Sequence, residues 1–354
     1  MNTIKDMLRV TLFGSDNAAS RNGAPAFDPG RDIPSLAGKT ILITGAAGDL
    51  GRQTTIELIR YGRPKRIYIA DLPLSDEEKQ ALMGRINDEA YGHSSSEFVD
   101  SGNTPRTDIR FLELDLASFE SVRRCAAEFT EQEPHLDILI LNAGIIRVIP
   151  RKTQEGYEAH FGINYLGHAL LARLLTPVLL RTAAERGFGD STADVRIAIV
   201  SSEGYLFAPE KGVDFDLVRT DCAKMPYSKR YGQSKLALIG LMKTLSRAHP
   251  QIKCVAIHPG RILTGMARGL QEESTLAWVA KPIAQVFCVP VSTGIKNHLW
   301  AATSEDVVSG TYYEPVGVPA TLSGVAAEES FVTRLEEWTD EALKGVDTVP
   351  SVEE

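Results

Sequence analysis

Cysteine is scarce in this sequence, and its placement excludes two common ways of stabilising a fold. The 354 residues contain only 4 cysteines, which lie far apart and form no C-x-x-C pair. Disulfide-rich domains and structural zinc sites both require cysteines at short, paired spacings. We therefore expect reduced thiols in an intracellular protein, and no metal site, from Cys125, Cys222, Cys254 and Cys288.

Long apolar runs and basic runs are also missing. No stretch approaches the roughly 20 uninterrupted apolar residues that cross a bilayer, which predicts no transmembrane segment. The formal net charge is -8 and no basic cluster offsets it, which argues against a nucleic-acid partner. The 43% hydrophobic and 24% charged residues are typical of a globular protein.

The first 35 residues differ in composition from the rest of the chain. Residues 15–38 are rich in Ser, Asn, Gly, Pro and Asp, and the segment before them is interrupted by Lys5, Asp6 and Arg9. We expect residues 1–35 to form an extended N-terminal arm on a cytoplasmic protein. Peripheral membrane contact or organelle import through this arm stays open as an alternative.

From Lys39 onward, short apolar runs alternate with segments of helical periodicity. This alternation predicts an α/β fold: a single-domain, Rossmann-type, doubly wound parallel sheet with helices on both faces. The strands read as continuous apolar runs because both faces of such a sheet are covered. Ligands bind beyond the carboxyl ends of the strands. The six predicted strands lie at 41–44, 66–71, 110–116, 136–144, 195–202 and 253–260.

Three glycines separate the first predicted strand from the helix that follows it. Gly45, Gly48 and Gly51 are spaced as G-x-x-G-x-x-G in the stretch ILITGAAGDLGRQTTIELI. Glycine permits positive φ and the close approach of a pyrophosphate, and the helix N-terminus adds N–H donors. A tight turn without a ligand is the alternative. Asp49 brings a negative charge near the pyrophosphate, unless it serves as the helix N-cap.

Asp71 strengthens the interpretation of a dinucleotide site. It ends the second predicted strand, 20 residues after Gly51. A carboxylate at this place can accept hydrogen bonds from an adenosine ribose, and it would repel a 2′-phosphate. The sequence therefore predicts NAD as the cofactor and disfavours NADP. A surface aspartate that caps a loop is the alternative.

The motif YGQSK, residues 231–235, supplies a candidate acid–base pair. Tyr231 and Lys235 are four residues apart and share one face of a helix. An ammonium beside a phenol lowers its pKa from about 10, which makes a general acid–base group. The motif is weak alone, since a second copy runs from Tyr61 to Lys65. Pro64 disfavours a helix in that copy.

The glycine turn, Asp71, an NAG triplet and Y-x-x-x-K occur in an order that resembles the short-chain dehydrogenase/reductase family. The resemblance covers residues 36–320, an NAD-binding domain with a substrate cleft. It implies a proline–glycine turn beside the nicotinamide and an aspartate on the adenine side. The coenzyme-binding residues that it implies are Gly45, Gly48, Asp49, Leu50, Gly51, Asp71, Asp115, Leu116, Asn142, Ala143, Gly144, Tyr231, Lys235, Pro259, Gly260 and Thr264.

The same resemblance implies a catalytic set of Ser202, Tyr231, Lys235 and Asn164. Tyr231 would exchange a proton with the substrate oxygen, and Ser202 would hydrogen-bond that oxygen. Lys235 would lower the tyrosine pKa and hold the nicotinamide ribose, and Asn164 would hold a proton-relay water. Ser201 competes with Ser202 for the role of the serine.

Three features resemble the retinol dehydrogenase-like branch: the NYLGHALL helix, the late SGTYY segment and the 29-residue step from Ser202 to Tyr231. We expect the insert between these two residues to wall the substrate cleft. The segment 264–290 is interpreted as a mobile apolar lid or, equally, as a helical hairpin packed on the core. Residues 321–354 are expected to form a C-terminal helix and tail.

We therefore expect an NAD-dependent oxidoreductase that interconverts a secondary alcohol and a ketone or aldehyde on a fairly apolar small molecule. An epimerase or dehydratase that uses NAD transiently is one alternative, and a noncatalytic dinucleotide sensor is another. The leucine-rich stripe at 166–180 predicts sheet-packing core or a helix–helix face for a homodimer or tetramer. The seven histidines show no metal-ligand spacing. His258 is expected to be structural, and His160 and His168 to be packing or surface residues.

Overall fold

The computed structural model describes residues 26–92, 105–146, 148–187, 194–260 and 289–348. Within them, seven strands form one parallel sheet in the order β3-β2-β1-β4-β5-β6-β7. The order reverses between β1 and β4, which makes this boundary the switch point of a doubly wound sheet. The strands are β1 (Thr40–Thr44), β2 (Arg66–Asp71), β3 (Asp108–Glu113), β4 (Ile138–Leu141), β5 (Arg196–Val200), β6 (Lys253–Ile257) and β7 (Tyr312–Tyr313).

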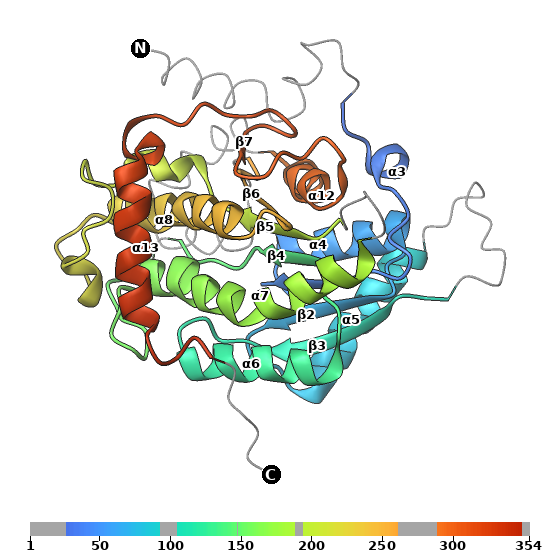
Figure 1. The fold of residues 1–354 in the computed structure, drawn as a ribbon. Helices are drawn as coiled ribbons and strands as arrows, with labels where there is room; N and C mark the ends of the chain where they lie inside the picture. Colours follow the sequence, from blue (N-terminus) through green and yellow to red (C-terminus); the bar gives the residue numbers. More distant parts are fainter. Residues whose placement is uncertain (1–25, 93–104, 147, 188–193, 261–288, 349–354) are drawn as a thin grey trace, which may run out of the picture.

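A layer of helices covers each face of the sheet (Figure 1). A hydrophobic core lies between the sheet and each layer, and alternate residues of a strand point into one core or the other. Leu42 and Tyr68 point into one core, and Ile41 and Ile43 into the other. The first layer holds α6 (Phe119–Gln132), η2 (Phe161–Leu166), α7 (Gly167–Arg186), α8 (Tyr227–Ala248) and α13 (Glu329–Leu343). The second holds α4 (Asp49–Glu57), η1 (Leu58–Gly62), α5 (Asp76–Tyr91) and α12 (Lys296–Thr303).

Shorter helical turns connect these elements. The segment between β5 and α8 contains two 3-10 turns, η3 (Glu203–Phe207) and η4 (Leu217–Arg219). The remaining short elements are α3 (Pro29–Asp32), α11 (Val291–Gly294) and η5 (Gly324–Ala327).

The predicted single-domain Rossmann-type sheet is confirmed, and the differences concern where strands end. The predicted strands 110–116 and 136–144 include residues that leave the sheet, since β3 ends at Glu113 and β4 at Leu141. Their last residues turn towards the cleft described below. The prediction missed β7, whose two residues are too few to show a strand period.

The leucine-rich stripe lies in the core. The continuous helix Phe161–Arg186 is long and apolar enough to cross a membrane by length and composition, but 78% of its most apolar window is buried inside the fold. The predicted packing of this stripe on the sheet is therefore confirmed. The helix α13 lies against α8 in Figure 1. The two helices pack closely, since a Cβ on Gly240 would lie 2.4 Å from Cδ2 of Leu335.

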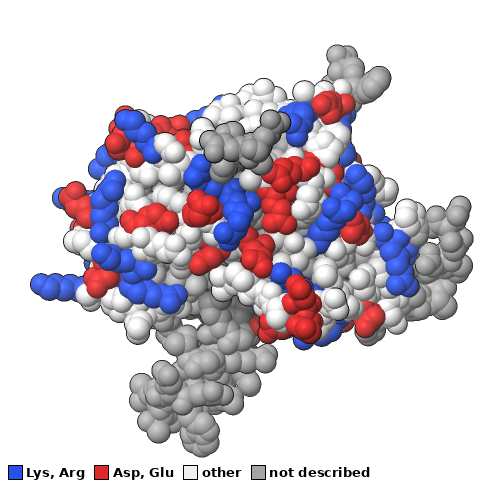
Figure 2. Space-filling view, turned by 90° about the horizontal axis from the view of Figure 1, so that it is seen from below, with Lys and Arg blue, Asp and Glu red and all other residues white. Residues whose placement is uncertain are grey.

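Some predicted segments lie outside the described residues. These are most of the N-terminal arm (1–25), the end of the tail (349–354), Thr264 and most of the proposed lid (264–288). On the face shown in Figure 2, acidic and basic side chains are interspersed, with no broad field of one sign among the described residues. The three described cysteines, Cys125, Cys222 and Cys254, are free and buried, as expected of reduced thiols.

Candidate active site

The glycine turn after β1 has the close packing that its residues predict. Gly45 has φ +67, and a Cβ on it would lie 2.8 Å from Cα of Ala143. A Cβ on Gly51 would lie 2.4 Å from the carbonyl oxygen of Gly45. Both positions therefore need glycine, and the backbone of the turn stays accessible at the N-terminus of α4. This is the kind of cradle into which a pyrophosphate fits.

Asp49 is not the N-cap of the helix. Gly48 occupies the N-cap position without a side-chain hydrogen bond, and Asp49 is the first helical residue. The cap alternative is therefore wrong. The helix can begin this way because an acidic side chain in the first turn is favoured by the helix dipole.

Asp71 is the last residue of β2 and lies beside the glycine turn. Its Oδ2 accepts a hydrogen bond of 2.7 Å from the backbone N–H of Ala47, and its Oδ1 accepts one of 2.9 Å from Leu72. The carboxylate thus also fixes the glycine turn. The side chain of Asp115, after β3, caps its own turn by accepting from the N–H of Ala117 at 2.8 Å.

The asparagine of the NAG triplet ties the ends of β1 and β4 together. The amide Nδ2 of Asn142 donates to the carbonyl oxygens of Thr44 (2.8 Å) and Gly45 (3.2 Å). The hydroxyl of Thr44 accepts from the backbone N–H groups of Asn142 (2.9 Å) and Ala143 (3.0 Å). These hydrogen bonds join the two strands at their carboxyl ends, where neighbouring chain segments diverge at the switch point of the sheet. Gly144 follows, with no room for a larger residue against Asn164.

Tyr231 and Lys235 share one face of α8, as their spacing predicts. The Nζ atom of Lys235 lies 5.7 Å from the centroid of the Tyr231 ring and donates to the carbonyl oxygen of Val200 at 2.9 Å. Burial lowers the pKa of Lys235 to about 8, so the ammonium is retained at neutral pH. A charge-bearing group thus sits directly beneath the phenol.

The pKa of Tyr231 differs from the expectation. Burial raises it to about 12, and hydrogen bonding by Ser202 lowers it only in part. The negative charge of Glu203 acts in the same direction as burial. In the protein alone, desolvation of the phenolate therefore outweighs the expected effect of Lys235.

Of the two adjacent serines, only Ser202 faces the tyrosine. The hydroxyl of Ser201 is buried and donates to the carbonyl oxygen of Lys235 at 2.8 Å. The Oγ of Ser202 accepts from the N–H of Gly204 at 3.1 Å and lies beside the phenol of Tyr231. The geometry thus favours Ser202 over Ser201 for contact with a substrate oxygen.

Asn164 lies in the π-helical turn η2 and orders two neighbouring segments. Its Oδ1 accepts from the N–H of Ile145 at 2.7 Å, and its Nδ2 donates to the carbonyl oxygen of Ile145 at 3.1 Å. The same Nδ2 donates to the Oγ of Ser234 at 3.0 Å. The π character of this turn follows from the bond between the N–H of Gly167 and the carbonyl of Gly162, five residues back. Asn164 therefore joins the loop after β4 to the helix that carries Tyr231.

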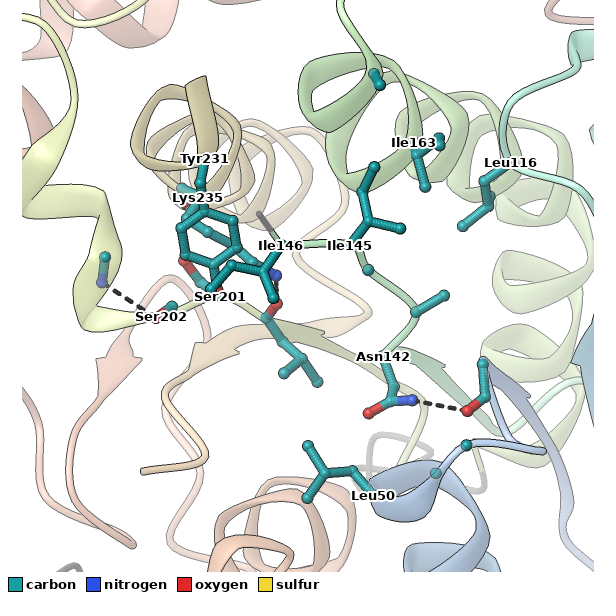
Figure 3. Close-up of a pocket in the computed structure, with 18 of the residues that line it drawn as sticks. Leu50, Leu116, Asn142, Ile145, Ile146, Ile163, Ser201, Ser202, Tyr231 and Lys235 are labelled. Atoms are coloured by element: carbon teal, nitrogen blue, oxygen red, sulfur yellow. Dashed lines mark hydrogen bonds between the residues drawn. The ribbon is translucent and has the colours of Figure 1, made fainter. Parts of the chain in front are cut away.

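One cleft of about 1220 Å³ brings these residues together. In Figure 3, Tyr231, Lys235 and Ser202 lie on one side of it, and Asn142 and Leu50 on the other. All predicted site residues except Asn164 and Thr264 line the cleft. They are Gly45, Gly48, Asp49, Leu50, Gly51, Asp71, Asp115, Leu116, Asn142, Ala143, Gly144, Ser202, Tyr231, Lys235, Pro259 and Gly260. Asn164 is buried behind it, and Thr264 lies outside the described residues.

The insert after Ser202 walls this cleft, as predicted. Its lining residues include Glu203, Phe207 and Tyr227, and Ile145 and Ile146 of the loop after β4 line the same cleft. Both Phe207 (53%) and Tyr227 (40%) remain partly exposed, so the cleft has an apolar mouth.

Sequence reasoning missed several supporting residues. A Cβ on Gly204 would lie 2.6 Å from Cε1 of Tyr231, so this glycine limits where the ring of Tyr231 can lie. His298 of α12 contacts Oδ1 of Asn142 at 3.2 Å. Neither residue belongs to a motif, although the dipeptide Glu203–Gly204 directly after the serines could have drawn attention.

The comparisons with known proteins agree with this geometry. The family model described as short chain dehydrogenase matches residues 39–190. An uncharacterized oxidoreductase of Schizosaccharomyces pombe is 36% identical over 316 residues, which cover 87% of this chain and 86% of that protein. The chain therefore belongs to the short-chain dehydrogenase/reductase family, a family of oxidoreductases.

Within this family, the chain resembles the retinol dehydrogenases. Human retinol dehydrogenase 14 is 32% identical over 295 residues, or 80% of each chain. The predicted branch is thereby confirmed. Among solved structures, the Pseudomonas aeruginosa RhlG/NADP complex has a TM-score of 0.55 at 22% identity, covering 78% of this chain and 94% of that chain. That likeness concerns the fold.

Proposed function

We propose that this protein is an NAD-dependent dehydrogenase/reductase that interconverts a secondary alcohol and a ketone or aldehyde on a fairly apolar small molecule. The observation that carries the proposal is the convergence of Ser202, Tyr231 and Lys235 on one cleft that also contains the glycine turn. The three side chains come from two separate segments of the chain, and packing alone does not require them to meet.

The residues of the cleft fit a nicotinamide dinucleotide. The pyrophosphate would lie on the turn of Gly45 to Gly51, where no Cβ blocks the backbone. Asp71 would accept from the adenosine ribose, which favours NAD over NADP. Lys235 would hold the nicotinamide ribose. The coenzyme supplies the acceptor or donor of the hydride, and the protein supplies position and electrostatics.

The protein side chains handle the proton. Tyr231 donates its phenolic proton to a carbonyl oxygen, or takes one from an alcohol in the reverse direction. Ser202 hydrogen-bonds the same oxygen as charge develops on it. The positive charge of Lys235, 5.7 Å from the ring centroid, stabilises the phenolate. Asn164 positions Ile145 and Ser234 around this group and would hold the proton-relay water.

Replacing Tyr231 by phenylalanine tests the proposal. We expect kcat to fall by a factor of about 10² to 10⁴, because the general acid–base group is lost while the ring still fills its place. The measurement is formation of reduced coenzyme with a panel of hydroxysteroids, retinoids, polyketide alcohols and sugars. Binding of NADH, followed by fluorescence, should change less than a few-fold, since the phenol makes only one of many coenzyme contacts.

Tyr68→Phe is the matched control for this substitution. The hydroxyl of Tyr68 is buried in the core and makes no hydrogen bond within the described residues, so its removal should leave kcat unchanged. If the wild-type enzyme is active and the Tyr231→Phe variant is equally active, the assignment of Tyr231 as the acid–base group is refuted.

The two alternative functions are less well supported. A noncatalytic sensor would not need the serine, tyrosine, lysine and asparagine that are all present here, and the relatives named above are an oxidoreductase and a dehydrogenase. An epimerase or dehydratase would consume substrate with no net change in NADH. The cytoplasmic location and the homodimer or tetramer through the long helices remain proposals, to be tested by fractionation and by size-exclusion chromatography.

A further inference from the structure

Two buried histidines approach the switch point of the sheet from opposite faces. His168 lies on α7 in the first helical layer, and His298 lies on α12 in the second. Both side chains are fully buried, and neither lines the cleft. They contact Thr44 and Asn142, the two residues that tie the ends of β1 and β4 together.

The hydrogen bonds around Thr44 fix the tautomer of His168. The hydroxyl oxygen of Thr44 already accepts two backbone N–H groups, so its proton is directed to Nε2 of His168, 2.9 Å away. Nε2 is therefore an acceptor, and the proton of the ring resides on Nδ1. That Nδ1–H donates to the carbonyl oxygen of Asn164 at 2.8 Å. His168 thus connects the end of β1 with the turn that holds Asn164.

The same reasoning gives His298 the opposite tautomer. The amide nitrogen of Asn142 donates to two carbonyl oxygens, of Thr44 and Gly45, which fixes the orientation of the amide. Its Oδ1 therefore faces Nε2 of His298 at 3.2 Å, which favours a proton on Nε2. Nδ1 makes no hydrogen bond among the described residues, and the carbonyl of Gly294 opposes the fall of the ring's pKa. His298 thus supplies the donor for the amide oxygen of the residue that holds the carbonyl of Gly45.

We propose that His168 and His298 are positioning residues that clamp the ends of β1 and β4 from both faces and thereby hold the coenzyme turn in its binding conformation. The inference rests on the proposed function, because the ligand of the turn is the coenzyme. Gly45 has φ +67 and no side chain of its own to fix it, so the turn depends on Asn142 and Thr44. The clamp therefore acts on coenzyme affinity more than on the proton-transfer step.

Two substitutions of His168 distinguish its hydrogen bond with Thr44 from its hydrogen bond with Asn164. In His168→Gln the amide oxygen can replace Nε2 and still accept from Thr44. In His168→Asn the shorter side chain can replace only Nδ1 and donate to Asn164, which leaves the Thr44 hydroxyl unpaired. We expect the Kd for NADH to rise about tenfold in His168→Asn and to stay within about threefold of wild type in His168→Gln. At saturating coenzyme, kcat should change by less than about threefold in both.

His298 gives an independent pair of variants. His298→Gln keeps an amide donor at the position of Nε2, whereas His298→Leu leaves Oδ1 of Asn142 unpaired. The loss of NADH affinity should therefore appear in the leucine variant and be largely rescued in the glutamine variant. His135→Gln serves as the matched control, since His135 is half-exposed and pairs only with Glu185.

A measurement on the wild-type protein tests the proposal even if the variants do not fold. Long-range ¹H–¹⁵N spectra of the histidine rings should show His168 protonated on Nδ1 and His298 on Nε2, with both sets of signals shifting when NADH is added. The opposite tautomer at either ring would overturn the clamp, as would wild-type NADH affinity in folded His168→Asn and His298→Leu. If the wild-type protein binds neither NADH nor NADPH, the proposed function fails first, and the clamp has no ligand to act on.

Discussion

At the scale of single residues, Asp71 has two tasks on the same carboxylate. It accepts from the N–H of Ala47 in the glycine turn and from the N–H of Leu72 at the end of its own strand. Each oxygen retains a second lone pair, so the carboxylate can bind a ribose without releasing the turn. In the proposed function, coenzyme choice and turn geometry are therefore coupled through this one side chain.

Replacing Asp71 by alanine tests this coupling. We expect the ratio of kcat/KM with NAD to kcat/KM with NADP to fall about 10-fold to 100-fold, because charge-assisted hydrogen bonds are lost and repulsion of a 2′-phosphate disappears. Steady-state kinetics with both coenzymes measures the ratio, which cancels the general weakening caused by loss of the Ala47 contact.

Asp76→Ala is a suitable control, since Asp76 lies in the first turn of α5 with its side chain 91% exposed. An unchanged ratio in Asp71→Ala, together with normal folding, would contradict the assignment of NAD preference to this residue.

At the scale of elements, the contact between η3 and α8 determines the position of the catalytic ring. Gly204 in η3 packs against the ring edge of Tyr231, and its N–H donates to Ser202. This one short turn therefore contacts both Tyr231 and Ser202. Any side chain at position 204 must displace the tyrosine or the serine.

We predict that Gly204→Ala lowers kcat at least about 10-fold while the Kd for NADH changes little. The new Cβ would lie 2.6 Å from the ring, and a displaced general acid loses alignment with the substrate oxygen. Gly84→Ala is the control, because a Cβ there meets nothing within 4 Å and Gly84 lies within a helix. Wild-type kcat in Gly204→Ala would show that this contact does not constrain the ring.

The sequence predicted long elements and motif residues well, for physical reasons. The strand at 66–71 is predicted with the bounds that β2 has, Arg66–Asp71, because its apolar run is continuous and bounded by polar residues. Asp71, Tyr231 and Lys235 could be placed because their chemistry depends on spacing within one strand or helix. The paired carbonyl contacts of Asn142 could not, since they depend on how two strands end in three dimensions.

Other errors have the same origin. Asp49 was considered as an N-cap on residue type, yet the backbone places Gly48 at that position. The pKa of Tyr231 was expected to fall because Lys235 is near in sequence, but the burial that raises it is a property of the folded cleft. The contacts of His168 with Thr44 and of His298 with Asn142 could not be predicted, because these partners lie more than 100 residues away along the chain.

At the scale of the whole molecule, the two buried histidines link stability to pH. Burial lowers the pKa of both His168 and His298 to about 4, and the charge of Lys235 acts in the same direction. Both imidazoles are therefore neutral in the folded protein over the physiological range. In the unfolded chain they titrate near the ordinary value of about 6.5.

The free energy of unfolding should therefore fall as the pH is lowered from about 6.5 towards 4. In this window the unfolded chain binds protons that the folded protein does not, and above it these histidines contribute no pH dependence. We expect a loss of about 2 kcal/mol per histidine at pH 5, measured by urea unfolding at pH 8 and pH 5.

A folded His168→Gln variant removes one of these two buried imidazoles and should lessen the loss by about 2 kcal/mol. Burial also lowers the pKa of His249, which adds to the loss in the same direction. The carboxylates Glu158 and Asp194, whose pKa values are lowered, add to acid sensitivity mainly below this window. A free energy of unfolding that stays level between pH 8 and pH 5 would mean that neither histidine is held neutral.

The π-helical turn η2 has a consequence for which changes in length this protein tolerates. Each residue advances an α-helix by about 100°, so deleting one residue from Phe161–Leu166 would rotate everything that follows relative to what precedes. Either Asn164 would swing away from Ile145, or the buried leucines of α7 would turn towards solvent. Insertions and deletions should therefore be far more harmful in this six-residue stretch than conservative exchanges of its side chains.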